Sequence, residues 1–397
     1  MRRIFLFFFF SIQMLFCQEI PKELKIEIEN LKSENVLSRV YGAYKIRNLK
    51  FDVKESVPYL LNILDDERIV VDKILGKTSP WNEAKKTIIK IGSKALPYLF
   101  EKFNDETTSK NLKIKIIEIL GEINDETSLI FLEKIANEKD YDLKEKAIEI
   151  LSLNKNEIDF LINYFKTADN NLKIKIISGF GRTKNNQALP FLYELLNDKN
   201  WEIRKYTIWA IGEIKENVDI EKLIPLVKDK NEFVRKELAE AFGKIKNSST
   251  ISYLIELIND SNWIVKVASI KAASEFKDIR FFEPILNSLY DKQIEVKLEA
   301  IKALSVLKDK RATIPLISNL NDRYHLLVRE YCAYALGEIN DKRAIYSLIN
   351  LLKSENYELK KIARDSLRKI TGLDFGYDRE KWYNWAGQNR ISSIREN

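Results

Sequence analysis

The sequence predicts an all-α protein, built as a right-handed α-solenoid (superhelix) of about ten helical hairpins. First, the 397 residues include only 12 Gly and 8 Pro, beside many Lys, Glu, Ile and Leu, which is a helix-forming composition. Second, one segment returns about every 31 residues, the period of a repeat architecture. Third, the apolar residues of each repeat follow helical spacing. A single hairpin cannot bury its own apolar face, so neighbouring hairpins must stack.

Composition also limits the classes of function. Hydrophobic residues make up 45% of the chain and charged residues 31%, so it can form a core and is not a disordered protein. One His and two Cys are too few for most metal sites and most nucleophile–base pairs. We therefore expect no metal site and no cofactor. The net charge of +7 is too small to indicate a nucleic-acid-binding surface.

Residues 1–17 have the pattern of a signal peptide. Arg2 and Arg3 precede an apolar run from Ile4 to Phe16. This run is shorter than the ~20 residues that span a membrane, but it matches the apolar core of a secretory leader. We expect an exported protein, located in the periplasm or associated with the outer membrane.

Cys17 leaves two alternatives for the processing of this leader. Residues 14–17 resemble a bacterial lipobox, in which the Cys is acylated and becomes the first mature residue, although Phe16 stands where that box usually has a small residue. In the other alternative, cleavage next to Cys17 leaves a mature chain without lipid. Membrane contact is expected only through a lipid on Cys17. Because Cys332 is the one other Cys, no intrachain disulfide framework is expected.

The repeat register is clearest in residues 201–214, 232–245 and 327–339. Each segment ends near a Gly, which marks the repeat, and eight residues before the mark stands a base that follows an aliphatic residue. From residue 121 onward the base recurs in every repeat. These bases are Lys113, Lys144, Lys173, Arg204, Arg235, Lys266, Lys297, Arg329 and Lys360. We expect the repeat array to cover residues 81–370.

Each repeat is expected to contain two antiparallel helices. In residues 201–214, Ile203, Thr207 and Ala210 fall on one helical face, with small residues where two helices approach each other. A polar turn separates this helix from the next apolar one, as at residues 344–352. The Gly marks stand near helix ends, where we interpret them as left-handed caps; each is single, so they form no phosphate-binding loop.

The two ends of the array depart from the repeat pattern. Residues 18–80 are expected to form an N-terminal cap and an irregular first repeat, with an insertion at residues 65–80. Residues 371–397 are expected to form a C-terminal cap. Its short helix would place Trp382 and Trp385 on the apolar face of the last repeat.

The array resembles HEAT repeats, specifically the short bacterial kind first described in phycobilin lyases. Pro190, Asp198, Ile203 and Arg204 match that family's pattern of a Pro in the first helix, an Asp after it and an aliphatic–basic pair opening the second helix. The resemblance covers roughly residues 37–370. It extends to the repeat architecture and implies no lyase activity.

In that family the Asp and the base form a ladder through the stack. The resemblance implies such a ladder for the pairs Asp198/Arg204, Asp229/Arg235, Asp260/Lys266, Asp291/Lys297 and Asp322/Arg329. The pattern departs at Glu138, Thr167 and Ser354, where we expect the ladder to be weak or interrupted.

The second helix of a HEAT repeat generally lines the concave side, so its outward residues are candidates for binding a protein or peptide. Aromatic side chains are favoured anchors in such interfaces. The candidates are Lys205, Tyr206, Trp209, Lys236, Tyr331 and Tyr334. The alternative, that these aromatics pack across neighbouring repeats, is equally compatible with the sequence.

The remaining candidate residues favour no particular chemistry. His325 is the one His of the chain and is expected in an inter-helix turn, and Cys332 occupies a packing position. We therefore predict a non-catalytic, monomeric scaffold or adaptor of the bacterial cell envelope that binds a protein or peptide and no nucleic acid. The alternative is an enzyme or nucleic-acid-binding HEAT-like protein, glycosylase-like or lyase-like.

Overall fold

The computed structural model describes residues 20–321 and 325–389. The expectations for Cys17 and Asp322 therefore lie outside the described residues. The chain folds as two compact units, Met1–Leu151 and Ser152–Asn397. Each unit consists of helical hairpins that stack side by side, so the predicted all-α solenoid is confirmed.

The first unit contains eight helices in its described part. Consecutive helices form hairpins, and the second helices of neighbouring hairpins, α2, α4 and α6, pack on one another. The helices are α1 (Lys22–Lys32), α2 (Val36–Asn48), α3 (Val57–Asn62), α4 (Pro80–Ile91), α5 (Leu96–Asn104), α6 (Lys110–Ile123), α7 (Glu126–Ala136) and α8 (Tyr141–Ser152).

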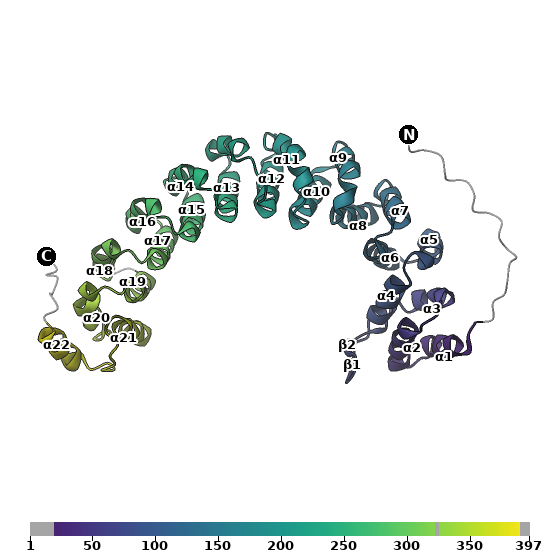
Figure 1. The fold of residues 1–397 in the computed structure, drawn as a ribbon, viewed down its shortest axis with the longest axis horizontal. Helices are drawn as coiled ribbons and strands as arrows, with labels where there is room; N and C mark the ends of the chain where they lie inside the picture. Colours follow the sequence, from purple (N-terminus) through teal and green to yellow (C-terminus); the bar gives the residue numbers. More distant parts are fainter. Residues whose placement is uncertain (1–19, 322–324, 390–397) are drawn as a thin grey trace. The chain divides into compact units, whose positions relative to one another are not determined.

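The insertion at residues 65–80 forms a small antiparallel β-hairpin between α3 and α4. Its strands are β1 (Val70–Asp72) and β2 (Gly76–Thr78), with Val71 opposite Lys77. The β-branched residues of β1 suit a strand, and Gly76 has a φ of 69°, which glycine adopts without strain. Within the first unit, the hairpin projects from the helices near α2 and α4 (Figure 1).

The second unit repeats the same hairpin of a shorter first helix and a longer second helix. In one repeat the first helix is replaced by a 3₁₀ helix, η6 (Ile224–Lys228). The first helices are α9 (Ile158–Phe165), α11 (Leu189–Leu195), α14 (Ile251–Ile258), α16 (Phe282–Asn287), α18 (Thr313–Asn319) and α20 (Ile345–Leu351). The second helices are α10 (Asn170–Arg182), α12 (Trp201–Ile214), α13 (Glu232–Ile245), α15 (Trp263–Phe276), α17 (Ile294–Leu307), α19 (Leu326–Ile339) and α21 (Tyr357–Thr371).

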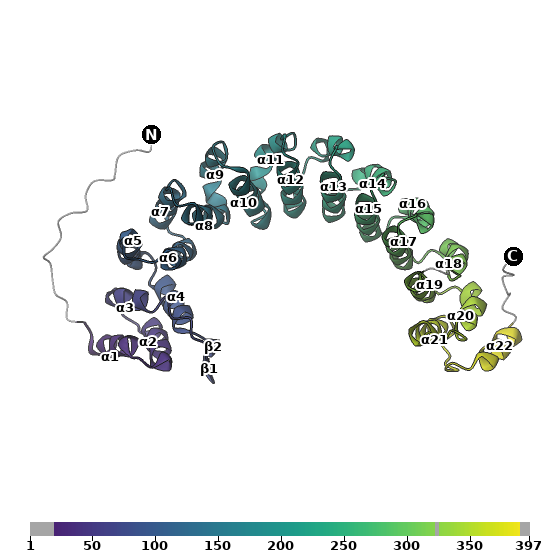
Figure 2. The same cartoon turned by 180° about the vertical axis from the view of Figure 1, so that it is seen from behind.

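These helices form two layers within the second unit. Consecutive second helices pack closely along their length, whereas consecutive first helices touch only weakly. A stack with one tight layer and one loose layer bends toward the tight layer. Figures 1 and 2 accordingly show the second helices on the inner side of this unit's curve.

Local capping explains where the second helices begin. Asn200, Asn231, Asn262 and Asn356 precede four of these helices, and each side-chain oxygen accepts a hydrogen bond from a main-chain N–H of the first turn. Asparagine is among the strongest N-cap residues because it satisfies a donor that has no partner inside the helix.

The interpretation of the Gly marks as left-handed caps is wrong for the second helices of the second unit, whereas Gly92, at the end of α4, does have a positive φ of 68°. Gly243 lies inside α13, and a Cβ there would lie 2.8 Å from the Cβ of Ala272 on α15. The left-handed cap stands three residues later, at Lys246, which has a φ of 55°. Glycine is therefore needed because neighbouring second helices approach each other closely at this level.

The C-terminal segment closes the last repeat with α22 (Arg379–Gln388), which packs on α20. Trp382 is fully buried, its ring contacts Phe375 edge-on at 4.8 Å, and its Nε1 donates a hydrogen bond to the carbonyl oxygen of Gly376. From the same helix, the Tyr383 hydroxyl donates to Asn350 in α20. No helix among the described residues is long and apolar enough to cross a membrane.

Candidate functional site

Arg204 opens α12 and connects two successive repeats. Its Nε and Nη2 donate to the carboxylate of Asp229 in the next repeat at 2.7 and 2.8 Å. Its Nη1 donates to the main-chain oxygen of Asp198 in its own repeat at 2.8 Å. The guanidinium thus binds one carboxylate in a bidentate way and one carbonyl, a geometry that lysine cannot reproduce.

The same arrangement continues along the stack. Arg235 donates to the carboxylate of Asp260 at 2.7 and 2.9 Å and to the main-chain oxygen of Asp229 at 2.7 Å. Lys266 donates a single hydrogen bond of 2.7 Å to Asp291. These three contacts form what we call the ladder: Arg204–Asp229, Arg235–Asp260 and Lys266–Asp291.

The ladder differs from the pairing within one repeat that the resemblance implies. Each of these three bases contacts the Asp carboxylate of the following repeat. Within their own repeats, Arg204 and Arg235 contact only the main-chain oxygen of the Asp. The physical reason is the stacking of the hairpins. The turn of the next hairpin lies beside the base, whereas the Asp carboxylate of the base's own repeat accepts hydrogen bonds within its own turn. For example, the Asp229 carboxylate also accepts from the main-chain N–H of Asn231 at 2.9 Å.

Arg329 continues the row of bases on α19, whereas Asp322, its predicted partner, lies outside the described residues. Arg329 donates through Nε to the main-chain oxygen of Leu320 at 3.0 Å. In the next repeat, Ser354 occupies the Asp position and has no carboxylate to receive this guanidinium.

The electrostatics of the ladder lower the pKa of two of its acids, Asp260 and Asp291. Burial alone would raise the pKa of Asp260, but hydrogen bonds from Arg235 and from the main-chain N–H of Asn262 outweigh it and hold that pKa below 3.8. The pKa of Asp291 is lowered in the same way, by Lys266 and the main-chain N–H of Gln293 against burial. At neutral pH these two carboxylates are therefore ionised.

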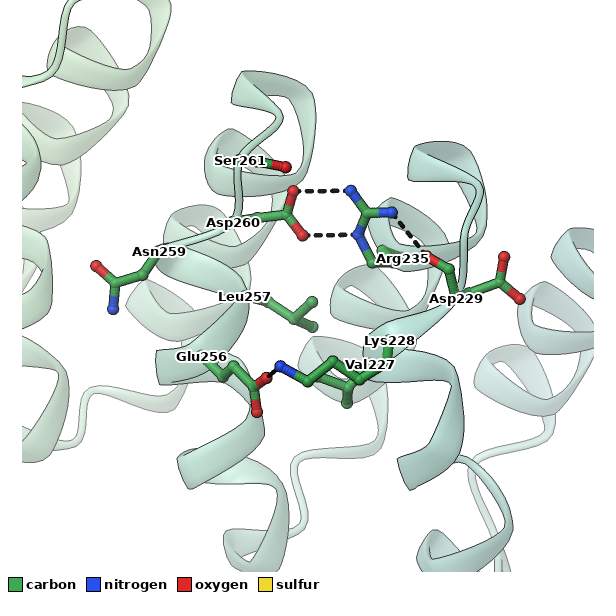
Figure 3. A pocket seen from close by; sticks show the side chains of 9 residues that line it. All are labelled: Val227, Lys228, Asp229, Arg235, Glu256, Leu257, Asn259, Asp260 and Ser261. Atoms are coloured by element: carbon green, nitrogen blue, oxygen red, sulfur yellow. Dashed lines mark hydrogen bonds and ion pairs between the residues drawn. The ribbon is translucent and has the colours of Figure 1, made fainter.

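A hollow of about 510 Å³ lies against the Arg235–Asp260 rung (Figure 3). Figure 3 shows Arg235 between the carboxylate of Asp260 and the main chain of Asp229, while Lys228 pairs with Glu256 on the other side. Nε, Nη1 and Nη2 of Arg235 are all used in these hydrogen bonds. This hollow therefore presents a structural ion pair rather than an available reactive group.

The structure brings four of the predicted inner-face residues together. Lys205, Tyr206 and Trp209 lie on α12, and Lys236 lies on the neighbouring α13. All four are half-buried. Lys205 Nζ lies 4.3 Å from the centroid of the Tyr206 ring. Lys236 pairs with Glu240 at 3.0 Å on the same helix. We call this group, with Glu237 described below, the α12–α13 patch.

Trp209 also packs against the preceding repeat. A Cβ at Gly181 of α10 would lie 2.7 Å from Cζ3 of Trp209, so the indole rests over a position that only glycine can occupy. Trp209 thus packs across neighbouring repeats, as the alternative interpretation of the inner-face aromatics expected.

Tyr331 and Tyr334 form a separate position on α19, with α15 and α17 between it and the α12–α13 patch. Tyr334 is 52% exposed, whereas Tyr331 is half-buried, with Lys302 Nζ 5.3 Å from its ring centroid. The predicted residues therefore make up two patches on the inner layer rather than one continuous surface.

Glu237 on α13 is the residue of this surface whose importance the sequence did not reveal. Its side chain is only 8% exposed, and Oε1 has no hydrogen-bond partner among the described residues. Burial, together with the nearby carboxylate of Glu240, raises the pKa of Glu237 above 4.5, although Lys236, Lys244 and Lys205 act against it. In sequence, an acid at an inner-face position looks solvated, and only the packing of α12 against α13 buries it.

The other candidates show no catalytic arrangement. Cys332 is fully buried inside α19, and His325 directly precedes that helix. Across residues 20–321 and 325–389, no group of three or more His, Cys, Asp or Glu side chains is placed to hold a metal ion.

The tandem hairpins, the tight inner layer and the ladder define a helical-repeat solenoid. Models of HEAT repeats match residues 158–241, 220–293 and 282–368, which together span more than half of the chain. The chain belongs to the HEAT-repeat proteins. Proteins of this class are generally protein-interaction scaffolds. No curated protein matches the chain.

Solved structures of low sequence identity share the fold. Yeast importin-β (Kap95p) aligns with a TM-score of 0.54 and 12% identity, over 93% of this chain and 61% of its own. The karyopherin Kap121p, bound to the SUMO protease Ulp1p, aligns with a TM-score of 0.55 and 13% identity, over 92% of this chain and 47% of its own. Human deoxyhypusine hydroxylase aligns at a TM-score of only 0.30, with 16% identity, over 64% of this chain and 99% of its own. That score supports no functional inference.

Proposed function

We propose that this protein is a non-catalytic scaffold or adaptor that binds a protein or peptide on the inner layer of its second unit. The observation that carries the proposal is the α12–α13 patch, where two aromatic rings, two lysines and the buried carboxylate of Glu237 share adjacent helices; its Oε1 has no hydrogen-bond partner among the described residues. Tyr and Trp are among the side chains that contribute most of the binding energy in protein interfaces. The HEAT-repeat family and the likeness to a karyopherin seen with a bound protein support this class of function.

The test is a crosslinked capture from native envelope extract, with residues 18–397 as bait. The variant Tyr206→Ala/Trp209→Ala/Tyr331→Ala/Tyr334→Ala removes the aromatic rings of both inner-layer patches. The proposal expects a partner that the wild type captures and the variant loses. Circular dichroism must show that the variant is folded, because Trp209 also packs over Gly181.

Tyr290→Ala is the matched control. Tyr290 is 66% exposed and lies in η9 (Ser288–Tyr290), which follows the first helix α16 and is not part of a second helix. Its removal should leave the capture unchanged. Equal capture by the wild type and the four-residue variant would reject the inner layer as the binding surface, and no specific partner would remove the support for an adaptor.

We further propose that the chain is exported to a bacterial cell envelope, with residues 1–17 as its leader. Arg2, Arg3 and the apolar run that follows support export, and Cys17 would be the lipid-bearing residue. Metabolic labelling with a radioactive fatty acid tests the lipid: wild-type protein should be labelled and Cys17→Ser should not. An unlabelled wild type with a mature N-terminus next to Cys17 would instead establish cleavage without acylation.

A further inference from the structure

The β-hairpin exposes an unusual cluster of aliphatic side chains. Among the described residues, three of the five most exposed large apolar side chains lie in its segment 69–74: Val71 at 82%, Ile74 at 74% and Ile69 at 62%. A single exposed aliphatic residue is ordinary on a protein surface, but a cluster of them marks an interaction site.

The two faces of the hairpin differ in character. Along β1, Val70 and Asp72 are half-buried, whereas Ile69 and Val71 are exposed, as the two-residue period of a strand requires. Lys77 pairs with Val71 across the strands and shares its outer face. The outer face is therefore aliphatic and basic.

Side-chain hydrogen bonds fix the tip of the hairpin. The Asp72 carboxylate accepts from the main-chain N–H groups of Ile74 and Leu75 at 2.8 and 3.0 Å. It also accepts from the Tyr41 hydroxyl of α2 at 2.8 Å. Because a two-stranded hairpin is marginally stable by itself in water, these contacts hold the exposed aliphatic residues in place.

The base of the hairpin is tied to the helices as well. Asp66 pairs with Arg39 of α2 at 3.0 Å, and its main-chain oxygen accepts from the N–H of Trp81 at 3.0 Å. The Thr78 hydroxyl donates to Glu83 of α4 at 2.8 Å. The aliphatic cluster is thus presented on a rigid support, not on a loose loop.

Two lysines of the hairpin stand beside its exposed aliphatic side chains. Asp65 and Glu67 pair with Lys115 at 3.4 and 2.6 Å. The Asp72 carboxylate keeps its charge, but it lies on the half-buried face, where it accepts from the Tyr41 hydroxyl of α2. By contrast, Lys73 and Lys77 have no ion-pair partner in the part of the chain that the structure describes. The hairpin therefore exposes Ile69, Val71 and Lys77 on its outer face and Lys73 and Ile74 at its turn.

We propose that this hairpin docks on an anionic lipid surface. Ile69, Val71 and Ile74 enter the boundary between headgroups and acyl chains, while Lys73 and Lys77 extend their ammonium groups to the lipid phosphates. An anionic bilayer offers an apolar interior beneath a negative surface, which is the complement of this face. The strands have three residues each, too few for extended pairing with a partner strand. The site lies in the first unit and does not depend on the inner-layer patches.

Vesicle co-sedimentation tests the proposal with residues 18–397, which carry no lipid and include every described residue. The wild type should sediment with vesicles of equal phosphatidylglycerol and phosphatidylethanolamine and remain in solution with pure phosphatidylcholine. Val71→Asp/Ile74→Asp should weaken the binding at least about tenfold, since each aliphatic side chain loses its favourable burial. Lys73→Glu/Lys77→Glu should weaken it on the anionic vesicles as well.

The controls separate the hairpin from general hydrophobicity. Ile279→Asp changes an aliphatic residue that is 58% exposed elsewhere and should leave the binding unchanged. Val71→Trp adds a probe at the tip, whose fluorescence should shift to the blue on anionic vesicles and be quenched by brominated lipids. This variant keeps an apolar tip, so it tests insertion without removing the site.

Three results would overturn the proposal: no sedimentation of the wild type with anionic vesicles, equal sedimentation of the folded hairpin variants, or no fluorescence change at Trp in the Val71→Trp protein. Capture of a protein through Val71 and Ile74 in the absence of lipid binding would assign the hairpin to a protein partner instead.

Discussion

Arg235 and Asp260 come from successive repeats, 25 residues apart in sequence, and are joined by two hydrogen bonds of 2.7 and 2.9 Å. Their side chains are only 13% and 9% exposed. The third hydrogen bond of the guanidinium holds the turn of its own repeat. One side chain thus fixes both the turn inside a hairpin and the position of the next hairpin.

This relationship predicts that Arg235→Met destabilises the second unit. The substitution keeps most of the aliphatic stem but leaves the Asp260 carboxylate largely buried without its cation, and breaking such a pair costs about 2–4 kcal/mol. Chemical denaturation should show the loss. Because repeat arrays can unfold in parts, hydrogen exchange should locate it in α13 and α15.

Arg280→Met is the control for the ladder. Arg280 pairs with Asp278 by two hydrogen bonds of 2.9 and 2.7 Å, but the two residues belong to the same turn and the arginine is 55% exposed. We expect no measurable change in stability. An equal loss in the two variants would mean that the ladder does not connect the repeats.

The repeats and the ladder residues could be predicted from sequence because they recur. Arg204 and Arg235 each follow an aliphatic residue, and Asp198 and Asp229 stand six residues before them; these local patterns are visible in one chain. The partner of each base could not be read in the same way. It depends on which turn the stacking places beside the guanidinium, and sequence position favours the Asp of the same repeat.

Features that occur once were harder to predict. The β-hairpin appears in sequence only as extra length at residues 65–80, since its clamps to Tyr41 and Glu83 are tertiary contacts. The burial of Glu237 depends on the helix beside it. The role of Gly243 was misread because a glycine near a helix end can serve either a left-handed turn or a close helix contact, and the geometry distinguishes them.

The close helix contact predicts that Gly243→Ala is destabilising, although alanine favours helices. The added Cβ would lie 2.8 Å from the Ala272 Cβ and 3.1 Å from its Cα, so α13 and α15 must separate. Overpacking of this kind costs about 1–3 kcal/mol. Thermal denaturation should show a lower midpoint for this variant.

Gly387→Ala is the same substitution at a position with open space, and we expect it not to destabilise the protein. Gly387 lies in the last turn of α22, and a Cβ there would meet no atom within 4 Å. Alanine should therefore be neutral or stabilise by up to about 1 kcal/mol. If Gly243→Ala behaved in the same way, close approach would not explain the glycines of the second helices.

The C-terminal cap predicts a strong effect of Trp382→Ala. The indole is fully buried and packs against Phe375, so its removal leaves a large cavity and should cost about 3–5 kcal/mol. Limited proteolysis should then cut near α22 and expose α20, on which it packs. Trp263→Ala, at a position that is 39% exposed, should leave the cleavage pattern unchanged. Protection of α22 in the Trp382 variant would contradict the role of this residue as the anchor of the cap.

Glu237 predicts a pH dependence opposite in sign to that of the ladder acids. Burial and the Glu240 carboxylate raise its pKa in the folded chain above 4.5, so the folded state holds this proton more tightly than the unfolded state. Its contribution to stability is therefore present below pH 4.5 and is lost as the pH rises through the raised value. The ladder acids Asp260 and Asp291, whose pKa values lie below 3.8, lose their contribution only as the pH falls below that value.

These windows allow the effect of Glu237 to be isolated between pH 4.5 and neutrality. Glu237→Gln keeps the size of the side chain but cannot ionise. It should therefore raise the free energy of unfolding at neutral pH relative to the wild type, and this gain should be smaller at pH 4.5. Denaturation curves at both values measure this difference. Glu295→Gln serves as the control, because it removes an exposed carboxylate on another helix, α17. If the pH dependence of the Glu237→Gln protein equalled that of the wild type, the carboxyl of Glu237 would be satisfied in solution, by water or by one of the lysines around it.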